Sequence, residues 1–596
     1  MSLLCNSVGE FNQFCAEHAP VALDIETTGL HIYKDKLRCV AACGIYTGAV
    51  KVWFTDTVEG LEVPQLVAHN IAYDVPFLCA HGAKSGDLKV LADTMILAHQ
   101  VDEDGQHGLK HLCARYFGVQ DWGLTDVATA GDEALLPYVI QDVTMTAALY
   151  KLLVDKLEGH PGKPYEVMRM VLYAQKALLE MEYRGIPVEL EEARRLQLQL
   201  DAQILEIEDR LNLRLPENIP AGLIPAKGRP KWGSTNLTRW MIYDAMGETP
   251  TRVGKPTKAY PEGAPSVAAK ALAAMPDNPV AVDVLELQKA KKLRNAFAKP
   301  IIDKAVDGRV YTSYRVTGTV TGRLACSSPG PHLPGINAQQ IPRDKRCRRL
   351  FKDRFKVWVE ADFSQLELRV AAFMAQEKAM LRLFAEGGDI HAHMAEKLAG
   401  KGFTKEHRSM AKAVNFGFLY GMSAQGFLEY AKSSYGLDVS YDEAVEFRKR
   451  FFQAFPGLEG WYQRQHREAL GLGGVLNLFG RFRHLPDVYA KDEFKRALAF
   501  RQAINAPVQS TGSDLMLLSL GKIVRSKKFR DAGGELVNTV HDSVEFLCPD
   551  VECGVFCGGV VREIMESVGD PVGLGGLVRC DVVVSDCWGG DEIAVV

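Results

Sequence analysis

A nine-residue stretch near the C-terminus, NTVHDSVEF (538–546), constrains the fold of this chain most. Apolar runs around Val537–Val540 and Val544–Leu547 predict two short strands, with His541 and Asp542 between them. One interpretation is a plain hairpin turn, because Asp and Ser side chains hydrogen-bond the nearby backbone. The other is a metal-binding carboxylate at the tip of a buried hairpin. One Asp cannot hold a divalent cation at a phosphoryl-transfer site, so this interpretation requires a second carboxylate.

The second carboxylate is found in VWVEADFSQLELRV (357–370), where an apolar strand carries Asp362 near its end. If this strand and the hairpin lie side by side, Asp362 and Asp542 can share a pair of Mg²⁺ ions. Mg²⁺ prefers oxygen ligands from a few carboxylates and substrate phosphates. Two such ions stabilise the attacking and leaving oxygens of a phosphoryl displacement. The pairing of the two strands is a hypothesis at this stage.

A third segment, HRSMAKAVNFGFLYGM (407–422), places Arg408, Lys412, Phe416 and Tyr420 four residues apart. On an α-helix this spacing makes one gently spiralling stripe. The two cations come first, near the positive end of the helix dipole, and suit the phosphates of a nucleoside triphosphate. The two rings suit its base and sugar. The alternative is an amphipathic helix with a mixed polar face.

Length and composition restrict the class of protein. A chain of 596 residues is too long for one hydrophobic core, so several domains are expected. We see no run of 18 apolar residues and no signal peptide, which predicts a cytoplasmic protein with no membrane partner. The 13 cysteines form no CxxC pair, and we expect them to be reduced.

The charge distribution leaves nucleic-acid binding open. A net charge of −4 argues against a uniformly basic surface but not against a basic cleft. The segment 343–356, RDKRCRRLFKDRFK, holds eight Lys or Arg residues and two Asp. It is interpreted either as a solvated loop or as a local basic cluster.

Patterning along the chain predicts its organisation. Residues 20–150 alternate strand-like and helical stretches, which indicates an α/β domain. Residues 165–212 are strongly helical and are interpreted as a helical hairpin arm. Two Pro/Gly-rich stretches, 216–235 and 247–266, predict loops at its tip, and a helix over 284–301 returns from it. From about residue 301 strands and helices mix again.

The three motifs DFSQLELR, R-x3-K-x3-F-G-x2-YG and VHDSVE, in that order, resemble motifs A, B and C of the family A DNA polymerases, the DNA polymerase I type. The flanking segments agree with the resemblance, which covers roughly residues 165–596. They are TGTVTGRLACSS (317–328), INAQQIP (336–342), GGDIHAHMAEKL (387–398), FGRFRHLP (479–486) and FRQAINAPVQSTGSDL (500–515). The resemblance implies a right-hand polymerase of thumb, palm and fingers.

The resemblance also implies roles for individual residues. Asp362, Asp542 and the carbonyl of Phe363 are expected to hold two Mg²⁺ ions, for which Mn²⁺ is a substitute. Lys412 is expected to protonate the leaving pyrophosphate. The other nucleotide-binding positions are Arg408 and Lys412 on the triphosphate with His391 and Gln365 nearby, Phe416 on the sugar and base, Tyr420 beside the templating position, and Glu367 where a ribose 2′-hydroxyl would lie.

Eight further positions match residues that contact the primer–template in this family: Arg323, Asn337, Gln340, Arg481, Arg501, Asn505, Gln509 and His541. Such contacts on minor-groove acceptors differ little between base pairs and suit a copying enzyme. Three positions depart from the common pattern. Ser543 stands where many relatives have Glu, and Phe500 stands where a Glu often precedes the Arg. Phe416 in place of Tyr predicts discrimination against dideoxynucleotides.

A second set of acids precedes these motifs. DIETTGL puts Asp24 and Glu26 on one face of a strand. HNIAYD then supplies Asn70 and Asp74, and YVIQD supplies Tyr138 and Asp142 one helical turn apart. This ordered set, over about residues 18–155, resembles the DEDD-type 3′–5′ exonucleases of the subclass with Tyr before the last Asp. The resemblance implies that Asp24, Glu26, Asp74 and Asp142 bind two metals and that Tyr138 orients the attacking water. Asp93 is expected to be structural.

The expected fold is therefore an α/β and α+β multidomain chain: an RNase H-like exonuclease domain followed by a right-hand polymerase. The expected boundaries are exonuclease 1–158, helical thumb 159–300 with flexible tip loops 216–266, palm 301–369, fingers 370–474 and palm 475–596. Because all four acids are present, we expect active proofreading.

With about 20 residues before the exonuclease motif, we expect no 5′ nuclease domain, a layout that resembles bacteriophage replicative polymerases. In that case the protein works in the host cytoplasm. Its expected partners are primer–template DNA, dNTPs and replication accessory proteins such as a helicase, a single-strand binding protein or a processivity factor. Two alternatives are a single-subunit RNA polymerase, which Glu367 disfavours, and a catalytically inactive nucleic-acid-binding scaffold.

Overall fold

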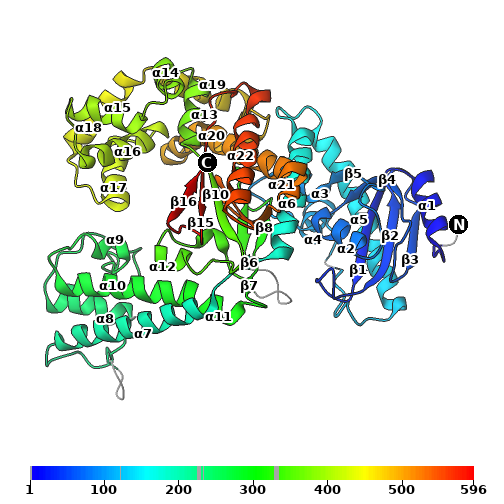
Figure 1. Cartoon of the computed structure of the whole chain (residues 1–596), viewed down its shortest axis with the longest axis horizontal. Coiled ribbons are helices and arrows are strands. Elements are labelled where there is room, and N and C mark those ends of the chain that lie inside the picture. Colours follow the sequence, from blue (N-terminus) through cyan, green and yellow to red (C-terminus); the bar gives the residue numbers. More distant parts are fainter. Residues whose placement is uncertain (1–2, 121, 225–229, 233, 259, 328–334) are drawn as a thin grey trace.

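The computed structural model describes all residues except 1–2, 121, 225–229, 233, 259 and 328–334. Figure 1 shows an N-terminal lobe (blue) beside a central β-sheet (green to red). In this view a helical lobe (yellow) lies above the central sheet, and a long helical arm lies below it. Parts of the segments 216–235, 247–266 and 317–328 that we singled out in the sequence lie outside the described residues.

The N-terminal lobe is a five-stranded sheet in the order β3-β2-β1-β4-β5, covered by helices. Strands β1, β2 and β3 pair antiparallel, while β4 runs parallel to β1 and to β5. Strand β1 is largely buried, as expected for a central strand, with Val21, Leu23 and Ile25 on one face and Asp24 and Glu26 on the other. The elements are α1 Val8–Glu17, β1 Val21–Thr27, β2 Leu37–Gly44, β3 Val50–Phe54, β4 Val63–Ala68, α2 Ile71–Ala80, β5 Leu88–Asp93, α3 Thr94–Val101, α4 Leu109–Phe117 and α5 Asp132–Leu157.

Helix α6 (Pro164–Arg184) differs from the expectation that residues 165–212 form one arm. It packs along α20 (Glu493–Arg525) and beside β13 (Glu535–Val540), so it belongs to the body of the molecule. The physical reason is its apolar face, in which residues such as Val171, Ala174 and Leu178 are buried. Gly185, at φ 68°, then ends α6 and turns the chain away.

The arm itself begins with α7 and returns through α10. Asn278 caps α10 by accepting the backbone N–H groups of Val280 and Ala281, and Pro279 occupies its first turn. At the tip, Arg252 Nη2 lies 3.4 Å from Glu429 Oε1 of the helical lobe, so the tip of the arm contacts that lobe. The elements are α7 Leu190–Leu213, α8 Thr235–Arg239, a π-helical turn Trp240–Ala245, α9 Ala269–Leu272, α10 Pro279–Leu293, a second π-helical turn Arg294–Ala298 and α11 Lys299–Lys304.

The central sheet is antiparallel, in the order β13-β14-β10-β15-β16. Helix α22 packs against β10, β14 and β15, where Gly554 lies close to Val357 and Val359. Because side chains alternate along a strand, Glu360 and Asp362 lie on the opposite face. The elements are β10 Val357–Phe363, β13 Glu535–Val540, β14 Ser543–Cys548, β15 Cys580–Ser585, β16 Glu592–Val595, α20 Glu493–Arg525, α21 Lys527–Asp531, α22 Val551–Ser567 and a 3₁₀ turn Asp570–Val572.

Short elements connect the sheet to its surroundings, and seven helices form the lobe beside it. The connecting elements are β6 Ile186–Pro187, β7 Arg309–Val310, β8 Ser313–Arg315, β9 Ala325–Ser327, a 3₁₀ turn Ala338–Gln340, α12 Lys345–Arg348, β11 Gly474–Leu476, β12 Phe482–His484 and a 3₁₀ turn Pro486–Tyr489. The helices are α13 Leu366–Ala375, α14 Lys378–Ala385, α15 Ile390–Ala399, α16 Lys405–Leu419, α17 Ala424–Tyr435, α18 Tyr441–Ala454 and α19 Gly457–Leu472.

The basic segment 343–356 is mostly neutralised by acids that are distant in sequence. Lys352 Nζ lies 2.7 Å from Asp586, and Lys356 Nζ lies 2.6 Å from Glu535. Arg354 forms a two-pronged contact with Glu189 at the base of the arm. These ion pairs connect the segment to the arm, to β13 and to the region after β15. Most of the segment therefore has a structural role and is not a free basic cluster.

Within the described residues, none of the helices combines the length and the apolar character that crossing a bilayer demands.

Candidate active sites

The two acids of the central sheet converge. Strand β10 pairs with β14 so that Asp362 lies opposite Ser543, and the Phe363 N–H donates to the Asp542 carbonyl at 3.0 Å. His541, at φ 58°, makes the tight turn that ends β13. Burial and the nearby Asp542 charge raise the pKa of Asp362 to about 7. Burial also raises the pKa of Asp542. Oδ1 of Asp362 is buried and has no protein partner, as expected of an oxygen meant for a cation.

Ser543 occupies the position where a third acid is common. Its Oγ donates to Glu545 Oε1 at 2.7 Å, two residues further along the same strand. Glu545 is fully buried and lies directly opposite Glu360 on β10. Burial and the Glu360 charge raise the pKa of Glu545 to about 8. The face of the sheet that carries Asp362 therefore holds two further acids, Glu360 and Glu545, deeper in the protein.

Helix α16 carries the predicted stripe. Arg408, Lys412 and Phe416 lie within it, and Tyr420 is its C-terminal cap. Arg408 and Lys412 are exposed, while Phe416 is half-buried. Arg408 Nε donates to Asp389 at 2.8 Å, and this exposed pair is weak enough to exchange for a phosphate.

His391 lies under the stripe rather than on it. It is buried between α15 and α16, its ring lies 5.7 Å from that of Phe416, and the Asn415 amide contacts its Nδ1 at 2.9 Å. Burial lowers the pKa of His391 to about 4, so the ring is neutral at pH 7. Gln365 adopts a left-handed conformation at the start of α13, and its side-chain oxygen is buried without a partner.

Glu367 is held from two sides near these acids. Arg323 Nη2 donates to its Oε1 at 2.5 Å, and the Tyr420 hydroxyl donates to its Oε2. The Glu367 charge also raises the pKa of Asp542, which places it within electrostatic reach of that acid. A carboxylate fixed in this way has little freedom to swing aside.

The predicted DNA-contacting residues differ in how exposed their side chains are. Arg501, Asn505 and Gln509 lie four residues apart on α20 as one half-buried stripe, and Gln340 and His541 are exposed. Asn337 is half-buried and donates to the Cys326 carbonyl at 2.6 Å.

Arg481 departs from the expectation that it contacts DNA. Its side chain is 4% exposed and is bound to the fully buried Asp514, with Nη2 2.5 Å from Oδ1. The Asn477 amide donates to the same carboxylate at 2.7 Å. Arg481 is therefore a structural residue that supports the turn at Gly322, beside which its guanidinium packs.

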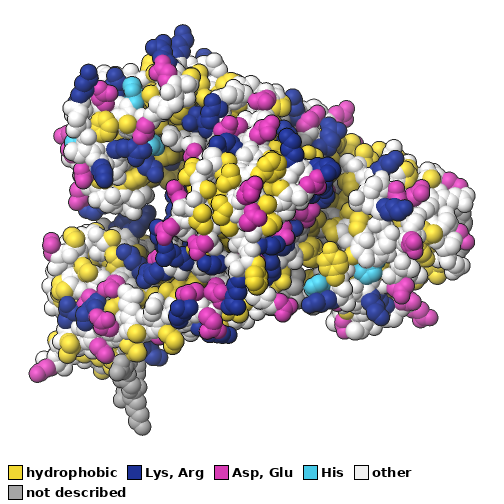
Figure 2. Space-filling model, viewed as in Figure 1, with side chains coloured by type: hydrophobic (Ala, Val, Ile, Leu, Met, Phe, Trp, Pro, Cys, Tyr) yellow, Lys and Arg dark blue, Asp and Glu magenta, His cyan; other side chains and the backbone are white. Residues whose placement is uncertain are grey.

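Sequence reasoning missed Arg343. Its positive charge opposes the rise in the pKa of Asp362 and also acts on Glu360 and His541, so Arg343 lies near the acids of the sheet. The available sequence signal was its place directly after INAQQIP, at the head of the basic segment 343–356. In the structure the other cations of that segment form ion pairs. Figure 2 shows Lys and Arg side chains gathered along the recess between the helical lobe and the arm, despite the net negative charge.

The acids of the N-terminal lobe also converge. Asp24 and Glu26 on β1 and Asp142 on α5 offer ligand atoms that all lie within 4.8 Å of one another. Burial, followed by the charges of Asp74, Asp142 and Glu26, raises the pKa of Asp24. Burial and Asp142 raise the pKa of Glu26 to about 8. Oδ2 of Asp24 is buried without a partner, so this set also fits a divalent cation.

Tyr138 and Asp93 lie between Asp74 and Asp142 in the sequence. Tyr138 lies one turn before Asp142 on α5. Asp93 caps α3 and also accepts the backbone N–H groups of Asn70 and Ile71. It is therefore structural, and it fixes the left-handed Asn70 at the start of α2.

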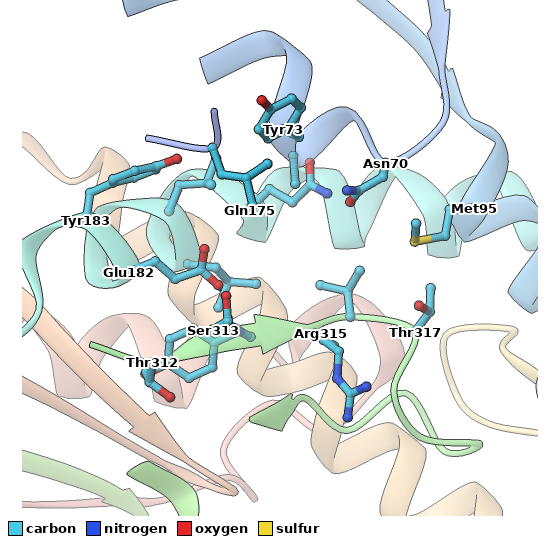
Figure 3. A pocket seen from close by; sticks show the side chains of 16 residues that line it. Asn70, Tyr73, Met95, Gln175, Glu182, Tyr183, Thr312, Ser313, Arg315 and Thr317 are labelled. Atoms are coloured by element: carbon cyan, nitrogen blue, oxygen red, sulfur yellow. Dashed lines mark hydrogen bonds between the residues drawn. The ribbon is translucent and has the colours of Figure 1, made fainter. Parts of the chain in front are cut away.

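A pocket of about 390 Å³ lies between the N-terminal lobe, α6 and β8. Figure 3 shows Asn70 and Tyr73 on one side of it and Ser313 on the other. Tyr73 Oη contacts Thr27 Oγ1 at 2.7 Å, next to the end of β1 that carries Glu26. Glu182 lines the pocket and accepts the Tyr314 N–H at 2.5 Å. The pocket is thus lined by residues of both the N-terminal lobe and the body of the molecule.

Comparison with known families gives two matches. Residues 227–590 match the model of DNA polymerase family A, and residues 5–158 match the model of a 3′–5′ exonuclease. The DNA polymerase I of Aquifex aeolicus (strain VF5) is 30% identical over 589 residues, which covers 92% of each chain.

Other relatives and one solved structure agree. The DNA polymerase of Bacillus phage SP01 is 28% identical over 578 residues, covering 85% of this chain and 60% of the phage protein. The thermostable DNA polymerase I of Thermus thermophilus is 30% identical over 521 residues, and the match spans 57% of that longer protein. The polymerase domain of Pol1 from M. smegmatis, solved with DNA primer–template and dNTP, has a TM-score of 0.80 at 23% identity. It covers 98% of this chain and shows the same fold.

Proposed function

The chain is a member of DNA polymerase family A with a 3′–5′ exonuclease domain, and on this premise we propose that it extends a DNA primer 5′ to 3′ with dNTPs and proofreads the product. The observation that carries the proposal is the convergence of Asp362, near the end of β10, with Asp542, in the turn that leads into the neighbouring strand β14. The domain limits given above and the residue roles below are part of this proposal.

Asp362, Asp542 and the Phe363 carbonyl are the groups that hold two Mg²⁺ ions at the polymerase site. The unpartnered Asp362 oxygen and the raised pKa values of both acids support this assignment, because clustered carboxylates need a cation nearby. When bound, the ions neutralise the attacking and leaving oxygens of the phosphoryl transfer. The same reasoning assigns two ions to Asp24, Glu26, Asp74 and Asp142 at the exonuclease site, with Mn²⁺ as a substitute at both.

Helix α16 supplies the groups that bind the incoming nucleotide. Arg408 exchanges Asp389 for a phosphate oxygen, and Lys412 gives a proton to the leaving pyrophosphate. Phe416 stacks on the sugar and base, Tyr420 lies beside the templating position, and His391 and Gln365 support the triphosphate. Glu367, immobilised by Arg323 and Tyr420, excludes a ribose 2′-hydroxyl and so selects deoxynucleotides.

Template and primer lie in the recess bordered by Lys and Arg side chains. Arg323, Arg343, Asn337, Gln340, Arg501, Asn505, Gln509 and His541 are the proposed DNA-contacting residues. Phosphate contacts of this kind release counterions, so affinity for DNA falls steeply with salt.

For proofreading, the unpaired primer end passes to the exonuclease acids, where Tyr138 orients the attacking water. Similarity to the polymerase of phage SP01 supports replication of a bacteriophage genome in the host cytoplasm as the setting. The tip loops 216–266 are then a candidate contact for accessory proteins.

The test is an assay of one purified protein on a mismatched primer–template with Mg²⁺. We expect shortening without dNTPs, extension with dNTPs, and no reaction of either kind in EDTA. Asp24→Ala combined with Glu26→Ala should abolish shortening and spare the extension of matched primers. A protein that extends matched primers but leaves the mismatch intact would refute the proofreading half of the proposal.

A further inference from the structure

A lysine and two aromatic rings from three separate segments meet beside the exonuclease acids. Lys110 lies in the first turn of α4, with Nζ 5.2 Å from the centre of the Tyr138 ring and 5.9 Å from that of Trp122. Trp122 Nε1 donates to Asp142 Oδ1 at 2.7 Å. The ammonium group of Lys110 is thus located by two rings, one of which is bonded directly to a proposed metal ligand.

Lys110 faces the acids electrostatically. Its charge lowers the pKa of both Glu26 and Asp142, opposing the effect of burial. Arg38 also acts on Glu26, but its guanidinium donates to the carbonyls of Val127 and Ala130 and to Asp132. Arg38 therefore holds the loop before α5, while the Nζ of Lys110 lies beside the Tyr138 and Trp122 rings.

A cation at this point suits a nucleic-acid end, because Lys or Arg stabilises the negative charge on the phosphoryl oxygens during transfer. Helix α4 adds to the same field, because it begins after Gly108 with no side-chain cap and no acid in its first turn. Free N–H groups at a helix N-terminus favour anions.

We propose that Lys110 binds a non-bridging phosphate oxygen near the 3′ end of single-stranded DNA in the exonuclease site, and that Trp122 positions Asp142. This inference rests on the proposed exonuclease function. Lys110 is a substrate-binding residue in it, and the rings of Tyr138 and Trp122 hold its ammonium group over the acids.

The competing explanation is that Lys110 only packs on the rings and stabilises the fold. The chain offers a matched control, because Lys156 on α5 lies 4.9 Å from the centre of the Tyr116 ring in the same lobe. Lys156→Gln removes a contact of the same kind that is not directed at the acids. Lys110→Gln removes the charge, and Lys110→Arg keeps it.

The experiment measures kcat/KM for hydrolysis of a single-stranded oligonucleotide by the full chain over a series of NaCl concentrations. For Lys110→Gln we expect a loss of about tenfold at low salt and a log–log salt slope smaller by about 0.7, the value for one phosphate contact on a single strand. Lys110→Arg and Lys156→Gln should keep the wild-type slope. Primer extension by each preparation should equal wild type and shows that the variant is folded.

The inference is overturned by an unchanged salt slope in Lys110→Gln, or by an equal loss in Lys156→Gln or Lys110→Arg. If Lys110→Gln also loses primer extension, the residue is structural and the inference fails. A wild-type protein that does not degrade the oligonucleotide refutes the exonuclease proposal itself, so the two failures can be distinguished.

Discussion

Glu103 makes one of the contacts between the exonuclease lobe and the polymerase body, and its removal should weaken that contact. Its side chain is 3% exposed and accepts three hydrogen bonds: from Arg483 Nη1 at 2.7 Å, from the His484 N–H at 2.7 Å and from His484 Nδ1 at 2.8 Å. Burial acts to raise its pKa, but the hydrogen bonds from His484 and Arg483 prevail and hold the pKa at about 2.

The magnitude follows from that shift. A fall of the Glu103 pKa from 4.5 to about 2, at about 1.4 kcal/mol per unit, corresponds to about 3 kcal/mol. Breaking a buried ion pair costs a similar amount, about 3–5 kcal/mol. Because the folded-state pKa is depressed, this contribution is complete above pH 4.5 and is lost as the pH falls through about 2.

Hydrogen exchange at the His484 amide reports this contact directly, since that N–H donates to Glu103. In Glu103→Gln we expect this amide to exchange about 100-fold faster at pH 7, the equivalent of about 3 kcal/mol. Asp104→Asn is the matched control. Asp104 also pairs with Arg483, at 2.6 Å, but is 60% exposed, so its loss should cost less than about 1 kcal/mol.

The reasoning is refuted if the His484 amide exchanges at the same rate in Glu103→Gln and in Asp104→Asn at pH 7. It is also refuted if the difference in unfolding free energy between wild type and Glu103→Gln does not shrink between pH 4.5 and 2.

Three further predictions concern single residues. Asp514→Asn should lower the free energy of unfolding by about 3–5 kcal/mol, measured by urea denaturation, because it leaves Arg481 buried without its counter-charge; a loss below 1 kcal/mol would contradict the pairing. Phe416→Tyr should reduce the discrimination against dideoxynucleotides, seen as a smaller ratio of the dNTP to ddNTP single-turnover rates, and comparable rates in wild type would show that Phe416 does not discriminate. Glu367→Ala should raise ribonucleotide incorporation, because it removes the carboxylate that Tyr420 and Arg323 hold in place. An unchanged ratio of rNTP to dNTP incorporation would show that Glu367 does not exclude the 2′-hydroxyl.

Much of the polymerase centre was predictable because its signals are local. Alternating apolar residues and turn chemistry in NTVHDSVEF predicted the hairpin, and the structure has β13 and β14 there. The strand ending near Asp362 and the helix with Arg408 and Lys412 were found at the expected residues. The adjacency of β10 and β14 was only a hypothesis from the sequence, and the structure confirms it.

The features that sequence reasoning missed depend on partners far away in the chain. The contact of Arg481 with DNA was inferred from its motif, and no local pattern indicates that Asp514, on a different element, neutralises it. The basic segment 343–356 was ambiguous for the same reason, since Asp586 lies more than 200 residues from Lys352. Helix α6 was grouped with the arm because periodicity shows that a helix has an apolar face but not which element covers it.

The most direct test of the account compares Asp542→Asn with the double variant Asp24→Ala, Glu26→Ala in the same two assays with Mg²⁺. We expect Asp542→Asn to lose detectable primer extension and still shorten single-stranded DNA, and the double variant to show the reverse. Primer extension at the wild-type rate by Asp542→Asn would contradict the claim that Asp362 and Asp542 form the centre of DNA synthesis.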